Sequence, residues 1–401
     1  MEKLRRLVSQ IATTPPSQRL SNLSSLQFSL IPLLSFASSV YSFALYIRHR
    51  LYHFSIFRQH RLPVPVISVG NLTWGGNGKT PMVEYIARWL LDFGISPLIL
   101  TRGYGGADEA KMLQRHLLGT SAKVGVGANR AATAATILER YGCINLCGST
   151  CSGRPFFSKE TQTASYSDKI GVAILDDGMQ HLRLWRDLEI VMVNGMMPWG
   201  NNQLLPLGPL REPLAALGRA DVVVVHHADL VAEENIEAIL STVWKVNNSL
   251  PVFFSKMAPS YFIKAAKTSC VISLRAVYDA IVLCVSAIGF AESFVQTILK
   301  MGPKHVDRLD FSDHHLFQTK DINVIRIRLK ELESEFAVQP IVVVTEKDYD
   351  RAPEVLKDLN PYQVLVLCSR LQIVPYKGCT EDSFKKFLRQ HLEISSASYI
   401  T

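Results

Sequence analysis

The chain has 401 residues, of which 48% are hydrophobic and 19% charged, a globular composition large enough for two lobes plus appendages. Its formal net charge of +8 suits an anionic partner such as a nucleotide, a phospholipid surface or a phosphorylated substrate, without choosing among them. Aromatic residues do not alternate with Lys or Arg, so the sequence predicts no nucleic-acid partner.

The amino terminus carries two segments of different character. Residues 1–20 hold four basic residues, one acidic residue and several Ser and Thr, which is typical of an organelle transit peptide and equally of a basic juxtamembrane segment. Leu26–Ile47 contains no charge and is about long enough to cross a bilayer. Its five serines, Gln27 and Pro32 leave three alternatives: a spanning helix, an interfacial helix, or a hairpin buried on the globular part.

The stretch that follows has the pattern of a phosphate-binding loop. An apolar run at Val64–Val69 predicts a buried strand, and a glycine-rich turn leads into Lys79-Thr80 and a helical pattern with apolar residues at Met82, Val83, Ile86 and Leu90. Glycines let backbone N–H groups turn onto phosphate oxygens, and the helix N-terminus adds partial positive charge.

Each position of this loop has an expected role with ATP and Mg²⁺. We expect Lys79 to reach the β- and γ-phosphates and the Thr80 hydroxyl to hold Mg²⁺. Thr73 replaces the first glycine of the usual G-x-x-x-x-G-K-[ST] pattern, and the strand context with its double glycine compensates. The predicted nucleotide contacts are Thr73, Trp74, Gly75, Gly76, Asn77, Gly78, Lys79 and Thr80.

Beyond residue 60, apolar runs alternate with helical stretches, which predicts an α/β fold with a parallel sheet covered on both faces. A second set of such elements predicts a smaller α/β lobe, joined near residues 250–275. We therefore expect a membrane-associating segment at 1–60, a phosphate-loop lobe at 61–255 and the smaller lobe at 256–395. The other expected strands are Ser96–Thr101, Lys123–Val126, Ile170–Leu175, Leu188–Val193, Asp221–Val225, Ala280–Val285, Pro340–Thr345 and Gln363–Leu367, and the expected helices are Asn129–Tyr141, Glu292–Met301, Ile322–Leu332 and Asp382–Leu392.

Polar residues follow the predicted strands, where ligands of parallel sheets bind. Asp176 and Asp177 end an apolar run, and an Asp at that place contacts the nucleotide's Mg²⁺ in phosphate-loop enzymes. Gln180 and His181 come next and could face substrate. The remaining candidates at strand ends are Arg102, which could clamp a phosphate, and the acidic pair Asp108-Glu109, which could accept a proton or form a solvated loop.

Histidines and cysteines leave further alternatives open. Asp313-His314-His315 could bind a metal, orient a base or face water, whereas His226-His227 ends a Val-rich strand and is interpreted as structural. Cys143, Cys147 and Cys151 are spaced four residues apart, but nearby glycines argue against a helix that would gather them. Free thiols in a reducing compartment are the default expectation, with a metal site as the alternative.

Taken together, these motifs resemble the tetraacyldisaccharide 4′-kinases of lipid A biosynthesis. The similar stretches occur in the family's order over roughly residues 60–350, and LDDGMQH with LLPLGPLREPL is more specific than a glycine loop. They are VGNLTWGGNGKTP, TRGYGG with DEA, ANRAATA, ILDDGMQHLRLWRDLEIV, GNNQLLPLGPLREPL, FSDHH and VVTEKD.

The resemblance implies a membrane-associated kinase that moves the γ-phosphate of ATP to the 4′-hydroxyl of an acylated glucosamine disaccharide 1-phosphate. It implies that Asp108 is the general base and that His314 works with it, with His315 as the fallback. It also implies active-site places for Arg102, Glu109, Arg211 and Glu212. The basic, Ser-rich amino terminus favours an organellar, mitochondrial version over a bacterial inner-membrane one.

The sequence differs from the family pattern at two places, around Asp108 and at Ala287–Phe294. The alternative function is a nucleotide-switched ATPase or GTPase that acts on a protein partner. Trp74 stands where such switches carry a Lys, and Thr345–Asp348 only approximates the N-K-x-D segment that GTP specificity needs.

Overall fold

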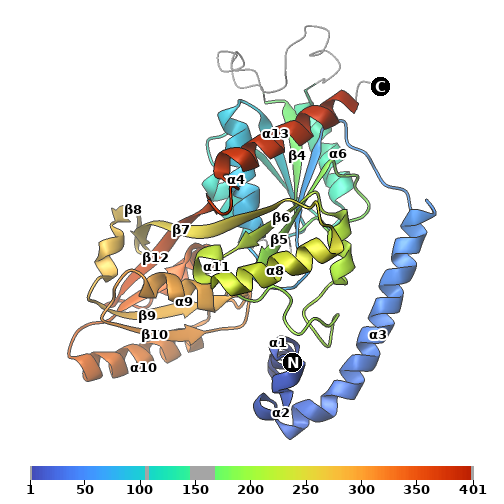
Figure 1. The fold of residues 1–401 in the computed structure, drawn as a ribbon. Coiled ribbons are helices and arrows are strands. Elements are labelled where there is room, and N and C mark those ends of the chain that lie inside the picture. Colours follow the sequence, from blue (N-terminus) through green and yellow to red (C-terminus); the bar gives the residue numbers. More distant parts are fainter. Residues whose placement is uncertain (1, 104–107, 145–167, 399–401) are drawn as a thin grey trace. The chain divides into compact units, whose positions relative to one another are not determined.

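The computed structural model describes residues 2–103, 108–144 and 168–398 (Figure 1). These residues form two compact units that are discontinuous in sequence, unlike the three consecutive segments expected. Unit 1 comprises Met1–Arg102, Thr120–Ser255 and Ile373–Thr401, and unit 2 comprises Gly103–Gly119 and Lys256–Gln372.

Unit 1 begins with helices α1 (Glu2–Thr13), η1 (Pro16–Gln18), α2 (Arg19–Asn22) and α3 (Ser25–His53). Helix α3 starts at a capping box, in which the Ser24 side chain accepts from the Gln27 backbone and the Gln27 side chain accepts from the Ser24 backbone. It continues through Pro32 and includes the whole uncharged segment. Only 11% of its most apolar stretch is buried, and no other described helix is both long and apolar enough to cross a bilayer.

The sheet of unit 1 is parallel and has the order β3-β2-β4-β1-β5-β6, with the first residues of β7 beside β6. Strands β1, β2, β4, β5 and β6 are buried along their whole length, as expected for a sheet covered on both faces. The strands are β1 (Val66–Gly70), β2 (Ser96–Thr101), β3 (Lys123–Val126), β4 (Ile170–Asp176), β5 (Leu188–Asn194), β6 (Val222–His226) and β7 (Val252–Lys264).

Helices pack on both faces of this sheet because successive strand residues point to opposite sides. Leu98 and Leu100 of β2 pack with helix α6, and Phe254 of β7 packs with α8. The adjacent Phe253 contacts Phe384 of α13, with ring centroids 5.0 Å apart. The helices of unit 1 that follow α3 are α4 (Lys79–Asp92), α6 (Arg130–Tyr141), η4 (Leu214–Arg219), η5 (Ala228–Leu230), α8 (Glu233–Val246) and α13 (Glu381–Ser398).

Unit 2 contains a second parallel sheet segment of order β10-β9-β11-β12, with the antiparallel hairpin β7–β8. Helices α10 and α12 pack on one set of strand residues and α9 on the alternate set. Its elements are α5 (Asp108–His116), β8 (Lys267–Ile272), η6 (Leu274–Val277), β9 (Ile281–Ser286), α9 (Ala291–Leu299), β10 (His305–Asp310), α10 (Thr319–Phe336), β11 (Ile341–Thr345), α11 (Glu346–Arg351), α12 (Pro353–Lys357) and β12 (Gln363–Val374).

The α/β fold with a phosphate-loop sheet is confirmed, and three local expectations need correction. The region near 250–275 is the long strand β7 and its hairpin, whose Lys256, Pro259 and Ser260 hid the strand pattern. Strand β10 was not expected because its exposed side carries charges. The acidic pair Asp108-Glu109 opens helix α5, where carboxylates favour the helix N-terminus, and does not lie on a loop.

Packing of α13 onto unit 1 gives the first testable prediction. Phe384 is fully buried between Phe253 and Tyr85. Phe384→Ala should lower the free energy of unfolding by about 3–5 kcal/mol, because it leaves a cavity that the sheet cannot close. Leu118→Ala, at a side chain 84% exposed, is the control and should change it by less than about 0.5 kcal/mol in a denaturant titration. Equal effects would contradict this packing.

Candidate active site

The phosphate loop follows strand β1 and leads into helix α4. Gly75 and Gly78 adopt φ angles of +91° and +76°, which glycine reaches without steric cost, and Gly78 is the N-cap of α4. Side-chain amides brace the loop: Asn77 Nδ2 donates to Thr73 Oγ1 at 3.1 Å, and Asn194 Nδ2 donates to the Gly76 carbonyl at 3.1 Å. The loop is therefore shaped by its own residues and by the end of β5.

A buried histidine lies directly behind Gly78. A Cβ atom at position 78 would come within 2.5 Å of the His226 ring, so no side chain fits there. His226 Nδ1 is 3.0 Å from Ser255 Oγ, and burial, aided by His227, holds the pKa of His226 well below its usual value. A neutral imidazole thus forms the rear wall of the loop.

Strand pairing brings the second carboxylate motif to the loop. Val69 of β1 lies opposite Asp176 of β4, and the Thr80 Oγ1 hydroxyl donates to Asp176 Oδ2 at 3.1 Å. Both side chains are buried, with 8% and 3% exposed. A hydroxyl and a carboxylate are oxygen donors of the kind that hold Mg²⁺ together with nucleotide phosphates. The described residues contain no cluster of three His, Cys, Asp or Glu side chains that would hold a metal alone.

Asp177, the next residue, adopts a φ of +54° and carries two ion pairs. Lys79 Nζ lies 3.6 Å from Asp177 Oδ1, and Arg211 Nη1 donates to the same oxygen at 2.7 Å. Burial alone would raise the pKa of Asp177, but Lys79 and Arg211 outweigh it and hold the pKa at about 2. The two ion pairs therefore contribute fully to the free energy of unfolding above the usual pKa of an aspartate. This contribution is lost as the pH falls through the lowered pKa of Asp177, about 2.

The residues after Asp177 lie against the same loop. Gln180 Nε2 donates to the Asn71 carbonyl at 3.0 Å, and Arg211 Nη1 is 3.4 Å from Gln180 Oε1. His181 Nε2 is buried and has no hydrogen-bond partner in the described part of the chain. Burial, with nearby Arg130 and Arg186, lowers the pKa of His181 to about 4, so this imidazole is neutral at pH 7.

Two other predicted contacts have distinct surroundings. Arg102 follows β2 and is exposed. The Glu212 carboxylate is 2% exposed and pairs with Arg219 at 2.8 Å and with His49 of α3 at 3.1 Å. Glu212 therefore joins α3 to the segment that carries Arg211.

In unit 2, helix α11 makes ion pairs with helix α5, which begins with the acidic pair Asp108-Glu109. Lys347 Nζ is 3.3 Å from Glu109 Oε1, and Arg115 Nη2 is 3.0 Å from Glu346 Oε1. Arg115 Nε also pairs with Asp350 at 2.9 Å. The side chain of Asp108 lies outside the described residues, as do Tyr104–Ala107, so the structure places Asp108 only as the first residue of α5.

The same helix α11 holds the histidine segment of unit 2. Arg351 Nη1 donates to the His315 carbonyl at 3.2 Å, and His315 Nε2 is 2.8 Å from Asp321 Oδ2. His314 adopts a φ of +63°, and its Nε2 is 3.7 Å from Asp313 Oδ2. Helix α11 thus contacts both elements of unit 2 for which the sequence predicts catalytic roles, α5 through Lys347 and the 313–315 segment through Arg351.

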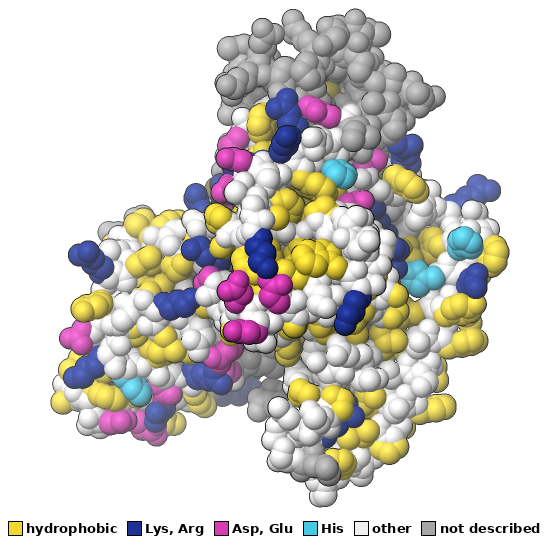
Figure 2. All heavy atoms as spheres, in the orientation of Figure 1, with side chains coloured by type: hydrophobic (Ala, Val, Ile, Leu, Met, Phe, Trp, Pro, Cys, Tyr) yellow, Lys and Arg dark blue, Asp and Glu magenta, His cyan; other side chains and the backbone are white. Residues whose placement is uncertain are grey.

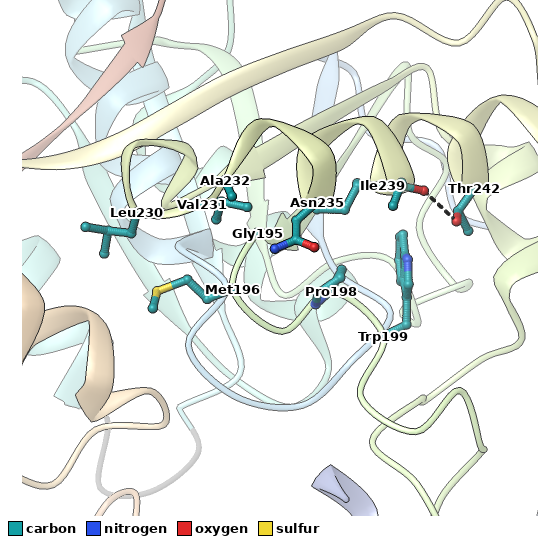
Figure 3. Close-up of a pocket in the computed structure, with 11 residues that line it drawn as sticks. Gly195, Met196, Pro198, Trp199, Leu230, Val231, Ala232, Asn235, Ile239 and Thr242 are labelled. Carbon is teal, nitrogen blue, oxygen red and sulfur yellow. Dashed lines mark hydrogen bonds between the residues drawn. The ribbon is translucent and has the colours of Figure 1, made fainter. Parts of the chain in front are cut away.

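A separate hollow of about 380 Å³ lies beside the end of β5 and along α8 (Figure 3). Trp199, Val231 and Asn235 line it, and no Lys or Arg does. Met196, at its rim, donates its backbone N–H to Asn194 Oδ1 at 3.0 Å. Without a cationic side chain among its described lining, this hollow does not suit phosphate.

Sequence reasoning missed three residues that shape the site. Arg130, 2% exposed, donates to the Asp177 carbonyl at 2.9 Å, and burial lowers its pKa in spite of Asp177 and Asp176. Asn194 braces the loop and Lys347 pairs with Glu109. The motifs ANRAATA and VVTEKD contained two of these. The cysteine cluster stays a prediction, since Cys147 and Cys151 lie outside the described residues, whereas Cys143 is a free thiol.

Comparison with known proteins supplies the family. Residues 30–393 match the family described as tetraacyldisaccharide-1-P 4′-kinase. A probable mitochondrial tetraacyldisaccharide 4′-kinase of Arabidopsis thaliana is 55% identical over 394 residues, 98% of each chain. The tetraacyldisaccharide 4′-kinase of Syntrophus aciditrophicus is 33% identical over 343 residues, 79% of this chain and 83% of the relative.

A solved structure agrees in fold. The crystal structure of LpxK from Aquifex aeolicus in complex with ATP is similar with a TM-score of 0.58 at 24% identity, covering 92% of this chain and 99% of that one. The likeness therefore extends over nearly the whole chain.

The wall behind Gly78 gives the second prediction. Gly78→Ala should raise the Kd for ATP by at least roughly tenfold, because the new Cβ would meet the His226 ring and shift the loop. Gly119→Ala is a matched control, since Gly119 also has a positive φ, +80°, with nothing within 4 Å of an added Cβ. Both changes carry the backbone cost of about 1–2 kcal/mol, but only the first should impair ATP binding in calorimetry. Unchanged ATP affinity in Gly78→Ala would show that the loop tolerates a side chain.

Proposed function

Because the chain belongs to the tetraacyldisaccharide 4′-kinase family, we propose that it transfers the γ-phosphate of ATP to the 4′-hydroxyl of a tetraacylated glucosamine disaccharide 1-phosphate. The observation that carries this proposal is that Lys79 and Thr80, at the start of α4, contact Asp177 and Asp176 at the end of β4. No observation favours a protein-directed nucleotide switch. The mitochondrial designation of the plant relative supports the organellar location expected from the amino terminus.

The reaction forms one P–O bond and breaks another. The 4′-oxygen bonds to the γ-phosphorus, the bond from that phosphorus to the bridging oxygen breaks, and ADP leaves with its electron pair. Thr80 and Asp176 would hold Mg²⁺, which supplies positive charge to the phosphates. Lys79 releases Asp177 and turns to the β- and γ-phosphates, while Arg211 keeps Asp177 ionised.

Asp108 is proposed as the base that accepts the 4′-hydroxyl proton, with His314 as its partner and His315 as the fallback. Support comes from the family resemblance and from α11, which holds both α5 and the 313–315 segment within unit 2. Arg102, Gln180 and His181 are proposed substrate contacts.

The membrane is the proposed docking surface of α3. Its exposed large side chains include Leu33, 64% exposed, Phe36, 71%, and Phe43, 63%. Contacts of Ser38 and Tyr41 with unit 1 keep the opposite side of the helix on protein, so an interfacial position fits better than a spanning one.

The kinase proposal predicts the outcome of a transfer assay. Purified protein, radiolabelled ATP, Mg²⁺ and the disaccharide lipid should give a labelled bisphosphate, and an acceptor with a 4′-deoxy group should give none. Lys79→Ala should reduce turnover by about a thousandfold or more, since the ammonium no longer neutralises the phosphates. Asp108→Asn should reduce it by about a hundredfold to ten-thousandfold.

Matched controls are Lys357→Ala and Asp168→Asn, which change an exposed Lys and an exposed Asp in surface ion pairs. They should leave turnover close to that of the wild type. Wild-type turnover in Asp108→Asn would remove Asp108 from the base role without affecting the transfer itself.

The docking proposal predicts weaker lipid binding after changes on α3. The double variant Phe36→Asp, Phe43→Asp should partition onto phosphatidylcholine–phosphatidylglycerol vesicles less well by roughly tenfold or more per residue. Each substitution replaces an apolar ring with a carboxylate that is unfavourable in the lipid interface. Tyr278→Asp, at an aromatic residue 70% exposed outside α3, is the control in the same flotation assay. Undiminished flotation of the double variant would place lipid binding elsewhere.

A further inference from the structure

Helix α3 has two faces on opposite sides of its axis. With 3.6 residues per turn, Leu33, Phe36, Val40, Phe43 and Ile47 form one stripe, and all are exposed. Figure 2 shows hydrophobic side chains at the surface on the side of the molecule where α3 lies in Figure 1. Ser38, Tyr41, Arg48 and His49 lie on the other side, together with buried Leu45. These four side chains are called the polar face of α3 below.

The polar face contacts two segments of unit 1, residues 177–181 and 204–212. Ser38 Oγ donates to the Leu204 carbonyl at 3.1 Å, and Tyr41 Oη donates to the Arg211 carbonyl at 2.8 Å. Arg48 donates to the Gln180 carbonyl, and His49 Nε2 is 3.1 Å from Glu212 Oε2.

Two of the residues whose carbonyls are held in this way, Arg211 and Gln180, reach the phosphate loop and its carboxylate with their side chains. Arg211 Nη1 contacts both oxygens of Asp177, at 2.7 and 2.9 Å. Gln180 Nε2 donates to the carbonyl of Asn71, which opens the segment before the glycine loop. Tyr41 therefore contacts the residue that pairs with Asp177, and Arg48 contacts the residue that bonds the Asn71 carbonyl.

Helix α3 has few other attachments. The side chains it buries are Gln27, Ser38 and Leu45, so hydrogen bonds rather than an apolar core hold it to unit 1. Its exposed apolar stripe is unfavourable in water and favourable in a bilayer interface. Lipid binding would therefore stabilise the helix in the position in which its polar face makes these bonds.

We propose that α3 is a positioning helix: Tyr41 and Arg48 fix Arg211 and Gln180 at the phosphate loop, and seating of the apolar stripe on a lipid surface raises turnover. This inference rests on the proposed kinase function and deepens it by regulation through the membrane. Tyr41 and Arg48 act through the two segments they hold.

The test separates membrane binding from catalysis. The full chain is given ATP, Mg²⁺ and a short-chain, water-soluble disaccharide acceptor, with and without phosphatidylcholine–phosphatidylglycerol vesicles. Vesicles should raise the kcat of the wild type. Tyr41→Phe and Arg48→Lys should bind vesicles as the wild type does but lose roughly tenfold in kcat on them, because a small misplacement of Arg211 or Gln180 slows transfer.

The helix offers matched controls. Tyr46 and Arg50 contact each other, with Arg50 Nε 3.0 Å from the Tyr46 hydroxyl, and within the described structure neither side chain hydrogen-bonds to residues 177–181 or 204–212. Tyr46→Phe and Arg50→Lys should keep vesicle activation. The thermal midpoint of Tyr41→Phe should equal that of the wild type, which excludes general unfolding as the cause of a lower kcat.

The failures are distinguishable. Absence of transfer by the wild type would overturn the kinase proposal and this inference with it. Transfer that vesicles do not accelerate, although the wild type binds them, would overturn the inference alone. The same holds if Tyr41→Phe and Arg48→Lys retain full activation.

Discussion

The adjacency of strands β1 and β4 is the constraint on which the site depends. It sets Asp176 beside the start of the loop, and the Thr80 hydroxyl then meets that carboxylate at 3.1 Å. The two groups come from positions 96 residues apart in the chain. Parallel pairing in the sheet, rather than local sequence, therefore creates the pair of oxygens that suits a nucleotide-bound cation.

Next to this pair, the positive charges of Lys79 and Arg211 are balanced by the carboxylate of Asp177. Lys79 and Arg211 neutralise Asp177, and Arg130 donates to the carbonyl of the same residue. A site with several cations gathered for phosphate needs such a carboxylate, because unpaired buried charges are costly.

The residues with proposed roles are divided between the two units. Unit 1 holds the phosphate loop and its carboxylates, and unit 2 holds α5 and the 313–315 segment through contacts of α11. Each unit is organised by a parallel sheet whose alternate residues pack helices on both faces. Residues from motifs far apart in sequence thereby become neighbours within each unit.

The phosphate loop, most strands and the two carboxylates could be predicted from the residues alone, since glycines, β-branched runs and Lys79-Thr80 express local chemistry. It also pointed to the kinase family through motif order. The folded chain was needed to show that Arg211 bonds Asp177, that Glu212 pairs with His49 and Arg219, and that α5 packs on α11. Apart from Glu212 and Arg219, these partners lie from 34 to 231 residues apart, and such long-range pairs follow from the packing of whole elements, which leaves no mark in a local pattern.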